Sequence, residues 1–332
     1  MNVLKSNLLI IVFLILANSA NAQPGEYPKS SPNDNGKPTQ ILISFYVLDC
    51  GEINNKEQSF TVDVFIRLKW KDPRISGATG PIPLNAIWNP NIQIFNLRDV
   101  DTRSPEVVTI LDDGSIQYIQ RYYAKLNCYL DFKAFPFDVQ TLPISLVAFT
   151  PDSVELVYEN AGSEKKFSIA DWKIEPVGPK NLENRANLFE ETSETIIRQR
   201  LDYEFKATRF IQFYYWKVLA PLMAILFLSW AVFWIDPSQV GAQIGVSGTS
   251  ILTLIAFLYK LDSILPPVSY LTHMDHAIFS ALVFVFVAYI EALISTTLAL
   301  GGKQQLALKM DLAFRIGYPV LFLIYIFVFW IR

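Results

Sequence analysis

The sequence has few of the residues from which most enzyme and metal sites are built. Only two cysteines occur, Cys50 and Cys128, and only two histidines, His273 and His276. Clusters of cysteine, histidine and carboxylate residues with metal-ligand or hydrolase spacing are absent, and so are glycine-rich phosphate loops. We therefore expect neither an enzyme nor a bound metal or cofactor.

Two cysteines are also too few for the disulfide framework that stabilises many small secreted domains. Cys50 and Cys128 could still form one bond in an exported protein, or they could remain two separate thiols. We favour two separate thiols.

The sequence lacks a block of basic residues. Its 28 Lys and Arg residues are outnumbered by 31 Asp and Glu residues, which gives a formal net charge of −3. Proteins that bind nucleic acid carry basic patches or stripes that neutralise phosphates. Nucleic acid is therefore not an expected partner.

Apolar residues, in contrast, make up 52% of the chain and are unevenly distributed. Up to about residue 209 polar and apolar residues alternate, and beyond it long apolar runs dominate. This change predicts a water-exposed domain followed by a membrane domain.

The N-terminus has the pattern of a secretory signal peptide. Lys5 supplies the positive start, residues 8–17 the apolar stretch, and Ala20-Asn21-Ala22 a cleavage site of small residues. We expect residues 1–22 to be removed; the alternative is an uncleaved first helix. The domain that follows would then lie on the periplasmic or extracellular side of the cell membrane.

Residues 23–40 are rich in Pro, Ser, Asn and Gly and predict a flexible lead-in. Residues 41–209 contain short alternating segments, separated by turn formers, that predict an antiparallel all-β sandwich of the immunoglobulin-like type. Phe60–Trp70 shows the two-residue period best. Its predicted buried face holds Phe60, Val62, Val64, Ile66 and Leu68, and its polar face holds Thr61, Asp63, Phe65, Arg67 and Lys69.

Four apolar stretches in residues 210–332 are each near the length that crosses about 30 Å of hydrocarbon as a helix. An exported N-terminal domain followed by four spans puts Lys303 and Lys309 on the cytoplasmic side, in agreement with the positive-inside rule. Glu291 lies inside the third span, and we expect it to face protein rather than lipid. The expected spans are about 210–234, 244–265, 277–300 and 313–331.

The second span differs from the other three because its first half is small and polar. At about 100° per residue, six residues fall on one narrow stripe, which favours a pore lining over tight helix packing. In a ring of such helices, Thr249 hydroxyls could replace part of an ion's hydration, and a Leu252 ring could close the pore by excluding water. The stripe consists of Gly245, Thr249, Leu252, Ala256, Tyr259 and Ser263.

A set of short motifs occurs in order along nearly the whole mature chain. Together they resemble the pentameric ligand-gated ion channels, also called Cys-loop receptors, and their bacterial members in particular. The matching residues are Trp70-Lys71-Asp72, Trp88-Asn89-Pro90, Phe135-Pro136-Phe137-Asp138-Val139-Gln140, Arg209, Pro221 and Leu265-Pro266-Pro267-Val268-Ser269-Tyr270.

Two departures from the family pattern indicate a bacterial-type chain. Cys128 occupies the first cysteine position of the family's disulfide loop, but Leu142 occupies the second, so that bond cannot form. The loop between the third and fourth spans is short, whereas eukaryotic members carry a large insertion there. The resemblance implies a homopentamer around a central pore, embedded in lipid, that conducts monovalent ions when its outer domain senses a small ligand or a pH change.

The resemblance also implies a ligand site in an aromatic cage between neighbouring subunits. The matching positions are Phe65, Phe95 and Phe149, with Phe189 as a looser match. Aromatic faces attract ammonium groups, so an amine is a reasonable agonist. The alternative is that these residues belong to the sandwich core.

Acid gating by the route known in bacterial members is not expected. That route uses a pore-helix histidine and a glutamate near the first strand turn, whereas the corresponding positions here are Leu254 and Gln58.

Coupling between the two domains is implied at their junction, where the resemblance places an ion pair between Asp138 and Arg209. The remaining coupling residues implied by the motifs are Pro136, Phe137 and Pro266.

The residues at the inner mouth of the pore do not determine the charge selectivity. Gly241-Ala242-Gln243 has neither the glutamate ring of cation-selective relatives nor the arginine of anion-selective ones. We favour cations, with an anion-selective channel as the alternative.

A non-channel protein, in which four helices anchor a β-sandwich sensor, is the competing interpretation. Replacing Leu252 with Ser distinguishes the two, because a polar collar would hydrate a closed pore. A channel with this change should leak or open more easily in current recordings, whereas an anchor should show no current with either residue.

Overall fold

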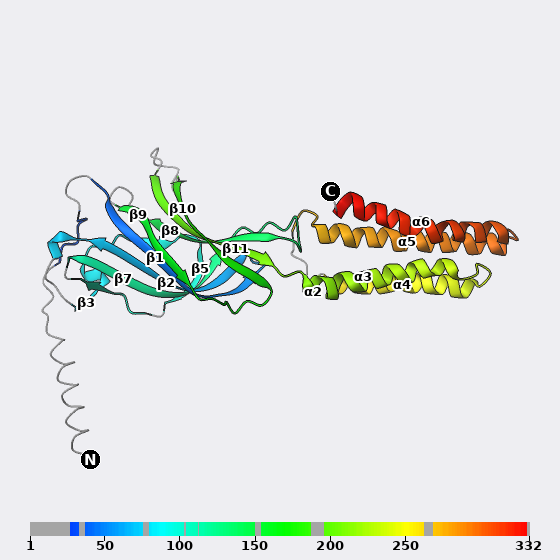
Figure 1. The fold of residues 1–332 in the computed structure, drawn as a ribbon, viewed down its shortest axis with the longest axis horizontal. Coiled ribbons are helices and arrows are strands. Elements are labelled where there is room, and N and C mark those ends of the chain that lie inside the picture. The colour runs from blue at the N-terminus through cyan, green and yellow to red at the C-terminus, as the bar shows by residue number, and fades with distance from the viewer. Residues whose placement is uncertain are drawn as a thin grey trace, which may run out of the picture.

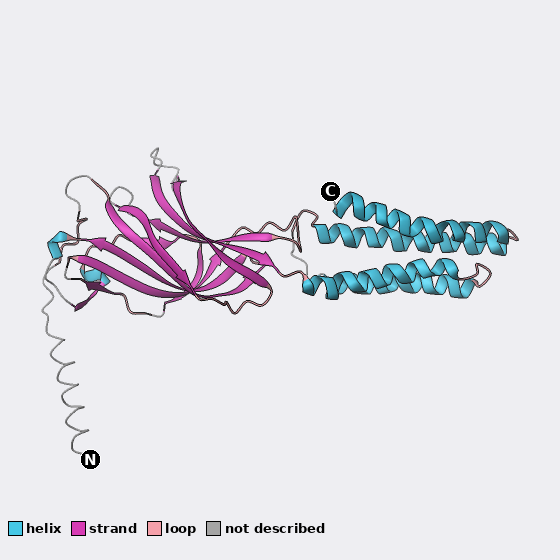
Figure 2. Cartoon of the chain, in the orientation of Figure 1, coloured by secondary structure: helices cyan, strands magenta, loops and turns pink. Residues whose placement is uncertain are grey.

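The computed structural model describes most of the chain in two halves, a domain of strands and a domain of helices that follow one another along the long axis (Figures 1 and 2). The predicted signal peptide lies outside the described residues. The described ranges are 27–32, 37–75, 80–102, 104–111, 113–149, 154–186, 196–261 and 268–330.

The strands form two sheets. The larger sheet has the order β3-β6-β7-β2-β1-β9, with β5 also paired to β7, and the smaller has the order β10-β11-β8-β4. The strands are β1 Thr39–Asn54, β2 Ser59–Lys71, β3 Gly80–Pro83, β4 Ile92–Ile94, β5 Leu97–Thr102, β6 Val107–Ile110, β7 Ser115–Asn127, β8 Val139–Ala148, β9 Val154–Ser163, β10 Trp172–Ala186 and β11 Ile196–Arg209.

The two sheets pack face to face around one core, as the predicted sandwich requires. On β2 the alternation is as predicted: Phe60, Val62 and Val64 are buried, and the residues between them are partly exposed. Phe45 of the larger sheet stacks on Tyr203 of the smaller sheet with ring centroids 5.0 Å apart. These contacts join the sheets near the middle of the sandwich.

One pairing differs from the antiparallel expectation, because β9 runs parallel to β1. Val154, the first residue of β9, is opposite Thr39, the first residue of β1. The chain leaves β8 in the smaller sheet and enters the larger sheet at the end where β1 begins. It must therefore run in the same direction as β1.

Four long helical segments follow, each apolar and long enough to cross a membrane. The first is broken by a π-helical turn just before Pro221, which cannot donate the backbone hydrogen bond that a regular α-turn needs there. The elements are α2 Gln212–Tyr214, the π-turn Tyr215–Leu219, α3 Ala220–Ala231, the 3₁₀ turn η5 Val232–Trp234, α4 Val240–Leu261, α5 His273–Leu300 and α6 Gln304–Trp330.

Some helices begin several residues before the expected positions. In these cases polar residues extend the helix beyond its apolar stretch. α5 begins at His273 because Thr272 and Asp275 form a capping box, in which each side chain bonds the other's backbone N–H. α6 begins at Gln304, so its polar first turns extend the span predicted from residue 313.

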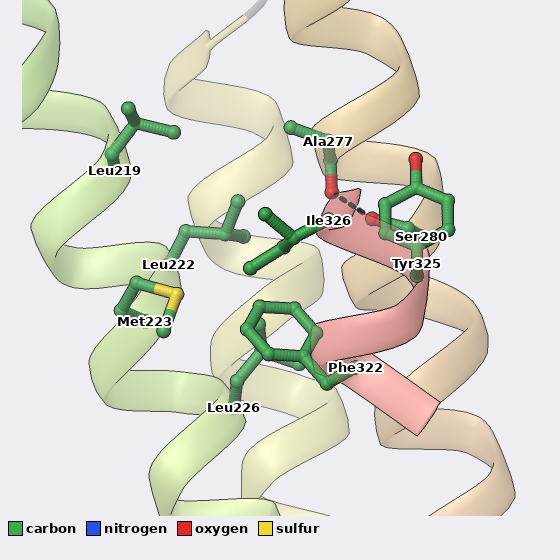
Figure 3. A pocket seen from close by; sticks show the side chains of 9 residues that line it. All are labelled: Leu219, Leu222, Met223, Leu226, Ala277, Ser280, Phe322, Tyr325 and Ile326. Carbon is green, nitrogen blue, oxygen red and sulfur yellow. Dashed lines mark hydrogen bonds between the residues drawn. The ribbon is translucent and has the colours of Figure 1, made fainter. Parts of the chain in front are cut away.

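The α6 helix is the most exposed of the four and is held to the others by a few polar contacts. The Ser229 and Tyr318 hydroxyls are 2.7 Å apart, and Trp230 Nε1 donates to the Arg315 carbonyl at 3.0 Å. An apolar pocket of about 180 Å³ remains between α3, α5 and α6 (Figure 3). Leu222, Met223 and Phe322 are among the side chains that line it.

Candidate functional site

The α4 helix presents its small polar stripe away from the rest of its own chain. Leu252 is 69% exposed and Tyr259 is 81% exposed. The stripe residues Gly245, Thr249 and Ala256 are exposed as well, while Ser263 lies outside the described residues. The opposite face of α4 is buried and holds Gln243, Ser247, Ser250, Leu254 and Leu261.

The threonine hydroxyls on this open side are bonded to the helix backbone. Thr249 Oγ1 donates to the Gly245 carbonyl at 2.7 Å, and Thr253 Oγ1 donates to the Thr249 carbonyl at 2.8 Å. Each hydroxyl donates its proton to a backbone carbonyl, so only the lone pairs of its oxygen are available to an ion. Lone pairs suit a cation better than an anion.

Phe65 lies on the outer face of the larger sheet, opposite Tyr46 on β1 and Arg121 on β7. The Arg121 guanidinium carbon is 5.6 Å from the Phe65 ring centroid, and Asp63 accepts two hydrogen bonds from this guanidinium at 2.9 and 2.7 Å. A pocket of about 520 Å³ opens beside Phe65, and Tyr46 and Arg67 are among its lining residues. The ring therefore forms part of an open, charged surface.

Phe95 and Phe149 lie on the outer face of the smaller sheet. The Phe95 N–H donates to the Ser145 carbonyl at 2.7 Å, and the Phe149 N–H donates to the Asn91 carbonyl at 3.1 Å. Phe95 bonds opposite Ser145, which is four positions before Phe149, and residues an even number of positions apart share a face, so both phenylalanines project from the same face. The Arg200 guanidinium carbon is 5.4 Å from the Phe95 ring centroid.

The predicted aromatic residues are thus not brought together within one chain. Phe65 is on one outer face of the sandwich, and Phe95 and Phe149 are on the other. None of the three belongs to the buried core, and Phe95 is 49% exposed. Phe189 lies outside the described residues.

Arg209 ends the last strand, and its side chain is buried at the junction of the two domains. Its Nε donates to Asp138 Oδ1 at 2.7 Å and its Nη2 to Asp138 Oδ2 at 3.0 Å, so the predicted ion pair is present. Gln140 Nε2 donates to the same carboxylate at 2.6 Å. Asn55 Oδ1, in the turn between β1 and β2, accepts a bond from Arg209 at 3.3 Å.

The loop that carries Asp138 also contacts the segment before α5 and the first turn of α5. The Phe132 N–H donates to the Tyr270 hydroxyl at 2.9 Å, and the Met274 N–H donates to the Phe135 carbonyl at 3.1 Å. Within the same loop, Pro136 follows a cis peptide bond and Phe137 is 37% exposed. Pro266, the remaining predicted coupling residue, lies outside the described residues.

Sequence reasoning missed Trp172, which the structure places against Arg209. The Arg209 guanidinium carbon lies 3.9 Å from the Trp172 ring centroid, which is the distance of a cation–π contact. The two residues are paired at the base of the β10–β11 hairpin. Trp172 and Arg209 are far apart in the sequence and share no short motif, so only the pairing of β10 with β11 could have predicted their contact.

The two cysteines are separate, as predicted. Cys50 and Cys128 are both buried and unbonded, and burial raises the pKa of each thiol to about 12. Leu142, at the second position of the family's disulfide, is fully buried in the core. Among the described residues no cluster of His, Cys, Asp and Glu could hold a metal ion.

Comparison with known proteins matches both halves of the chain. Residues 24–209 match the neurotransmitter-gated ion-channel ligand binding domain, and residues 218–300 match the transmembrane region of the same channels.

Individual relatives agree with these domain matches. The chain is 29% identical to a proton-gated ion channel of Gloeobacter violaceus over 307 residues, which are 87% of this chain and 81% of that protein. It is 25% identical to the glycine receptor subunit beta of Rattus norvegicus and of Homo sapiens, over 86% of this chain. The match spans 60% of the length of those receptor subunits.

The matched ligand-binding domain covers more than half of the chain, and the transmembrane match follows it in the order that the fold shows. The chain therefore belongs to the neurotransmitter-gated ion-channel family: it is a ligand-gated channel subunit, not an enzyme, with an extracellular β-sandwich and four membrane-spanning helices.

Proposed function

We propose that five copies of this chain form a cation channel whose pore is lined by α4. The exposed α4 stripe is the observation that carries this proposal. Thr249 and Leu252 are turned away from their own subunit, and the opposite face of the helix is packed against α3 and α5. Five such faces arranged around an axis would enclose a water-filled pore. The Thr249 hydroxyls would form a ring on the cytoplasmic side of a ring of Leu252 side chains.

Cation selectivity is supported by the hydroxyl geometry. The Thr249 proton is held by the Gly245 carbonyl, so a ring of Thr249 oxygens offers lone pairs to a passing ion. The inner mouth carries no arginine that would favour anions. An anion-selective pore is the second candidate.

Cysteine substitution on the two faces of α4 tests the pore. Thr249→Cys should make the current sensitive to a water-soluble cationic thiol reagent, whereas Ser247→Cys, on the buried face, should not. The native cysteines give little background because both are buried and their pKa values are about 12. Equal modification of both variants, or of neither, would contradict the proposed lining.

Current recordings also distinguish a cation-selective pore from an anion-selective one. In asymmetric KCl the current should reverse near the potassium equilibrium potential. Reversal near the chloride potential would establish the anion-selective alternative.

We further propose that a small ligand carrying an ammonium group binds between subunits. Phe149 and Phe95 of one subunit would face Phe65 of the next, which is consistent with their positions on opposite outer faces of the sandwich. Arginine guanidinium groups lie beside two of these rings, so the ring faces accept a cation, and Asp63 and Asp202 offset the charge of these arginines.

Ring removal tests this site in a screen of small amines. For an amine that activates the wild type, Phe149→Ala should raise the half-maximal concentration by roughly 30-fold, because a desolvated cation–π contact contributes about 2 kcal/mol. Phe149→Trp should preserve activation. Val177→Ala, a change at an exposed residue on β10, is the control. An unchanged half-maximal concentration in both Phe149→Ala and Phe65→Ala would exclude the aromatic site.

Opening is proposed to pass from the sandwich to the helices through the Arg209–Asp138 pair. Arg209 is contacted by three parts of the junction: Asp138 in the loop before β8, Asn55 in the β1–β2 turn, and Tyr214 at the start of the first membrane helix. A movement of any one of these parts therefore changes the position of the same guanidinium.

Arg209→Ala should assemble poorly or bind ligand without opening. It leaves the buried Asp138 carboxylate without its cation, a change that costs about 3–5 kcal/mol. Lys173→Ala removes one partner of an exposed ion pair with Glu175 and should leave assembly and current unchanged. Assembly is measured by size-exclusion chromatography and opening by current per surface pentamer. Wild-type current from a well-expressed Arg209→Ala channel would refute the coupling role.

A further inference from the structure

Five carboxyl side chains are buried among the residues that the structure describes, and only three of them have an arginine partner. The pairs are Asp72 with Arg74 at 2.8 Å, Asp138 with Arg209 at 2.7 Å and Asp202 with Arg200 at 2.6 Å. The other two are Glu291 on α5 and Asp311 on α6, which are 3% and 0% exposed.

Glu291 and Asp311 face each other across the α5–α6 contact. Ser295 lies one helical turn after Glu291 on the same face of α5, and its hydroxyl donates to Asp311 Oδ1 at 2.7 Å. Because Glu291 and Ser295 share this face of α5, the Glu291 carboxyl group lies beside the Asp311 carboxyl group. Both Glu291 oxygens and Asp311 Oδ2 are buried without a donor from the described protein groups.

Both residues lie in helices that are long and apolar enough to span the membrane, and both are buried by protein. Glu291 is nine residues before the end of α5 at Leu300, or about 13 Å along the helix, and Asp311 is about 10 Å from the start of α6 at Gln304. Water does not reach a carboxylate that protein buries in this way, and the surrounding lipid cannot solvate it. Two carboxylates in contact cannot both be ionised there.

No described side chain supplies a compensating cation. Arg315, one turn after Asp311, donates from Nε to the Phe233 carbonyl at 2.8 Å and lies over the Trp234 ring. Lys309 is exposed, and Tyr318 is bonded to Ser229. The buried face of α4 presents neutral Gln243 and Ser247, and neither α3 nor η5 has a titratable side chain.

We propose that Glu291 and Asp311 share a proton, and that this proton holds α6 against α5 within the membrane. A proton between two carboxyl oxygens supplies the donor that the buried oxygens otherwise lack. Its removal at high pH would leave two adjacent anions in hydrocarbon, whose repulsion separates the helices. The attachment of α6 is therefore present while the proton is bound and weakens as the pH rises.

The other described polar contacts of α6 do not involve this proton. Tyr325 donates to the His276 carbonyl at 2.9 Å, and Trp230 donates to the Arg315 carbonyl. The bond between Ser229 and Tyr318 provides a matched control, because Ser229→Ala weakens α6 without changing the charge of the helix pair.

Infrared spectroscopy of the full-length protein in lipid tests the proton directly. At pH 7 exposed carboxyls are ionised and the other described buried ones are paired with arginine, so a protonated-carboxyl carbonyl band in the wild type is expected to arise from this pair. The band should disappear in the double variant Glu291→Gln/Asp311→Asn. Absence of the band from the wild type, or its persistence in the double variant, would overturn the proposal.

Thermal denaturation between neutral and alkaline pH tests the consequence. The wild-type midpoint should fall by several degrees more than that of the double variant, which stays neutral throughout. Ser229→Ala should lower the midpoint by a similar amount at every pH. Parallel pH dependence of wild type and double variant would contradict the role of the proton in holding α6. If the double variant does not assemble, the presence or absence of the wild-type infrared band decides whether Glu291 and Asp311 share a proton.

Discussion

The ion pair between Arg209 and Asp138 is the interaction on which the arrangement of the two domains depends. Both side chains are almost fully buried, and Trp172 covers the guanidinium. A buried charge is tolerated only with its partner and with its remaining hydrogen bonds satisfied, and here Gln140 supplies the additional bond. The sandwich and the first membrane helix are therefore held together at one charged point.

Buried charge is handled differently in the membrane half. Among the residues that the structure describes, each buried carboxylate of the outer domain has an arginine within hydrogen-bonding distance, whereas Glu291 and Asp311 have each other and Ser295. The difference follows from the solvent. Arg74 and Arg200 keep part of their side chains in water, and Arg209 is covered by Trp172, but an arginine in hydrocarbon would itself have to be compensated. A proton compensates the membrane pair with far less desolvation than a second charged side chain.

The two faces of α4 differ in the way that the proposed pore lining requires. Ser247 and Ser250 are small and face α3 and α5, so the helices approach closely, and their hydroxyls bond to their own backbone. Thr249 and Leu252 lie on the open face. A uniformly polar helix would not pack in the subunit, and a uniformly apolar one would not admit water.

The sequence by itself determined the two-domain plan, the alternation on β2, the four spans and the open stripe of α4, because each depends on local periodicity. It also determined the separate thiols, because Leu142 stands where the family's second cysteine would be. It also identified Asp138 and Arg209 through a family motif. Only the tertiary structure decided that β9 runs parallel to β1, that Phe65 and Phe149 lie on opposite faces, that Trp172 covers Arg209, and that Glu291 meets Asp311. These facts join residues far apart in the chain, and their contacts depend on strand register and helix packing, which no local pattern specifies.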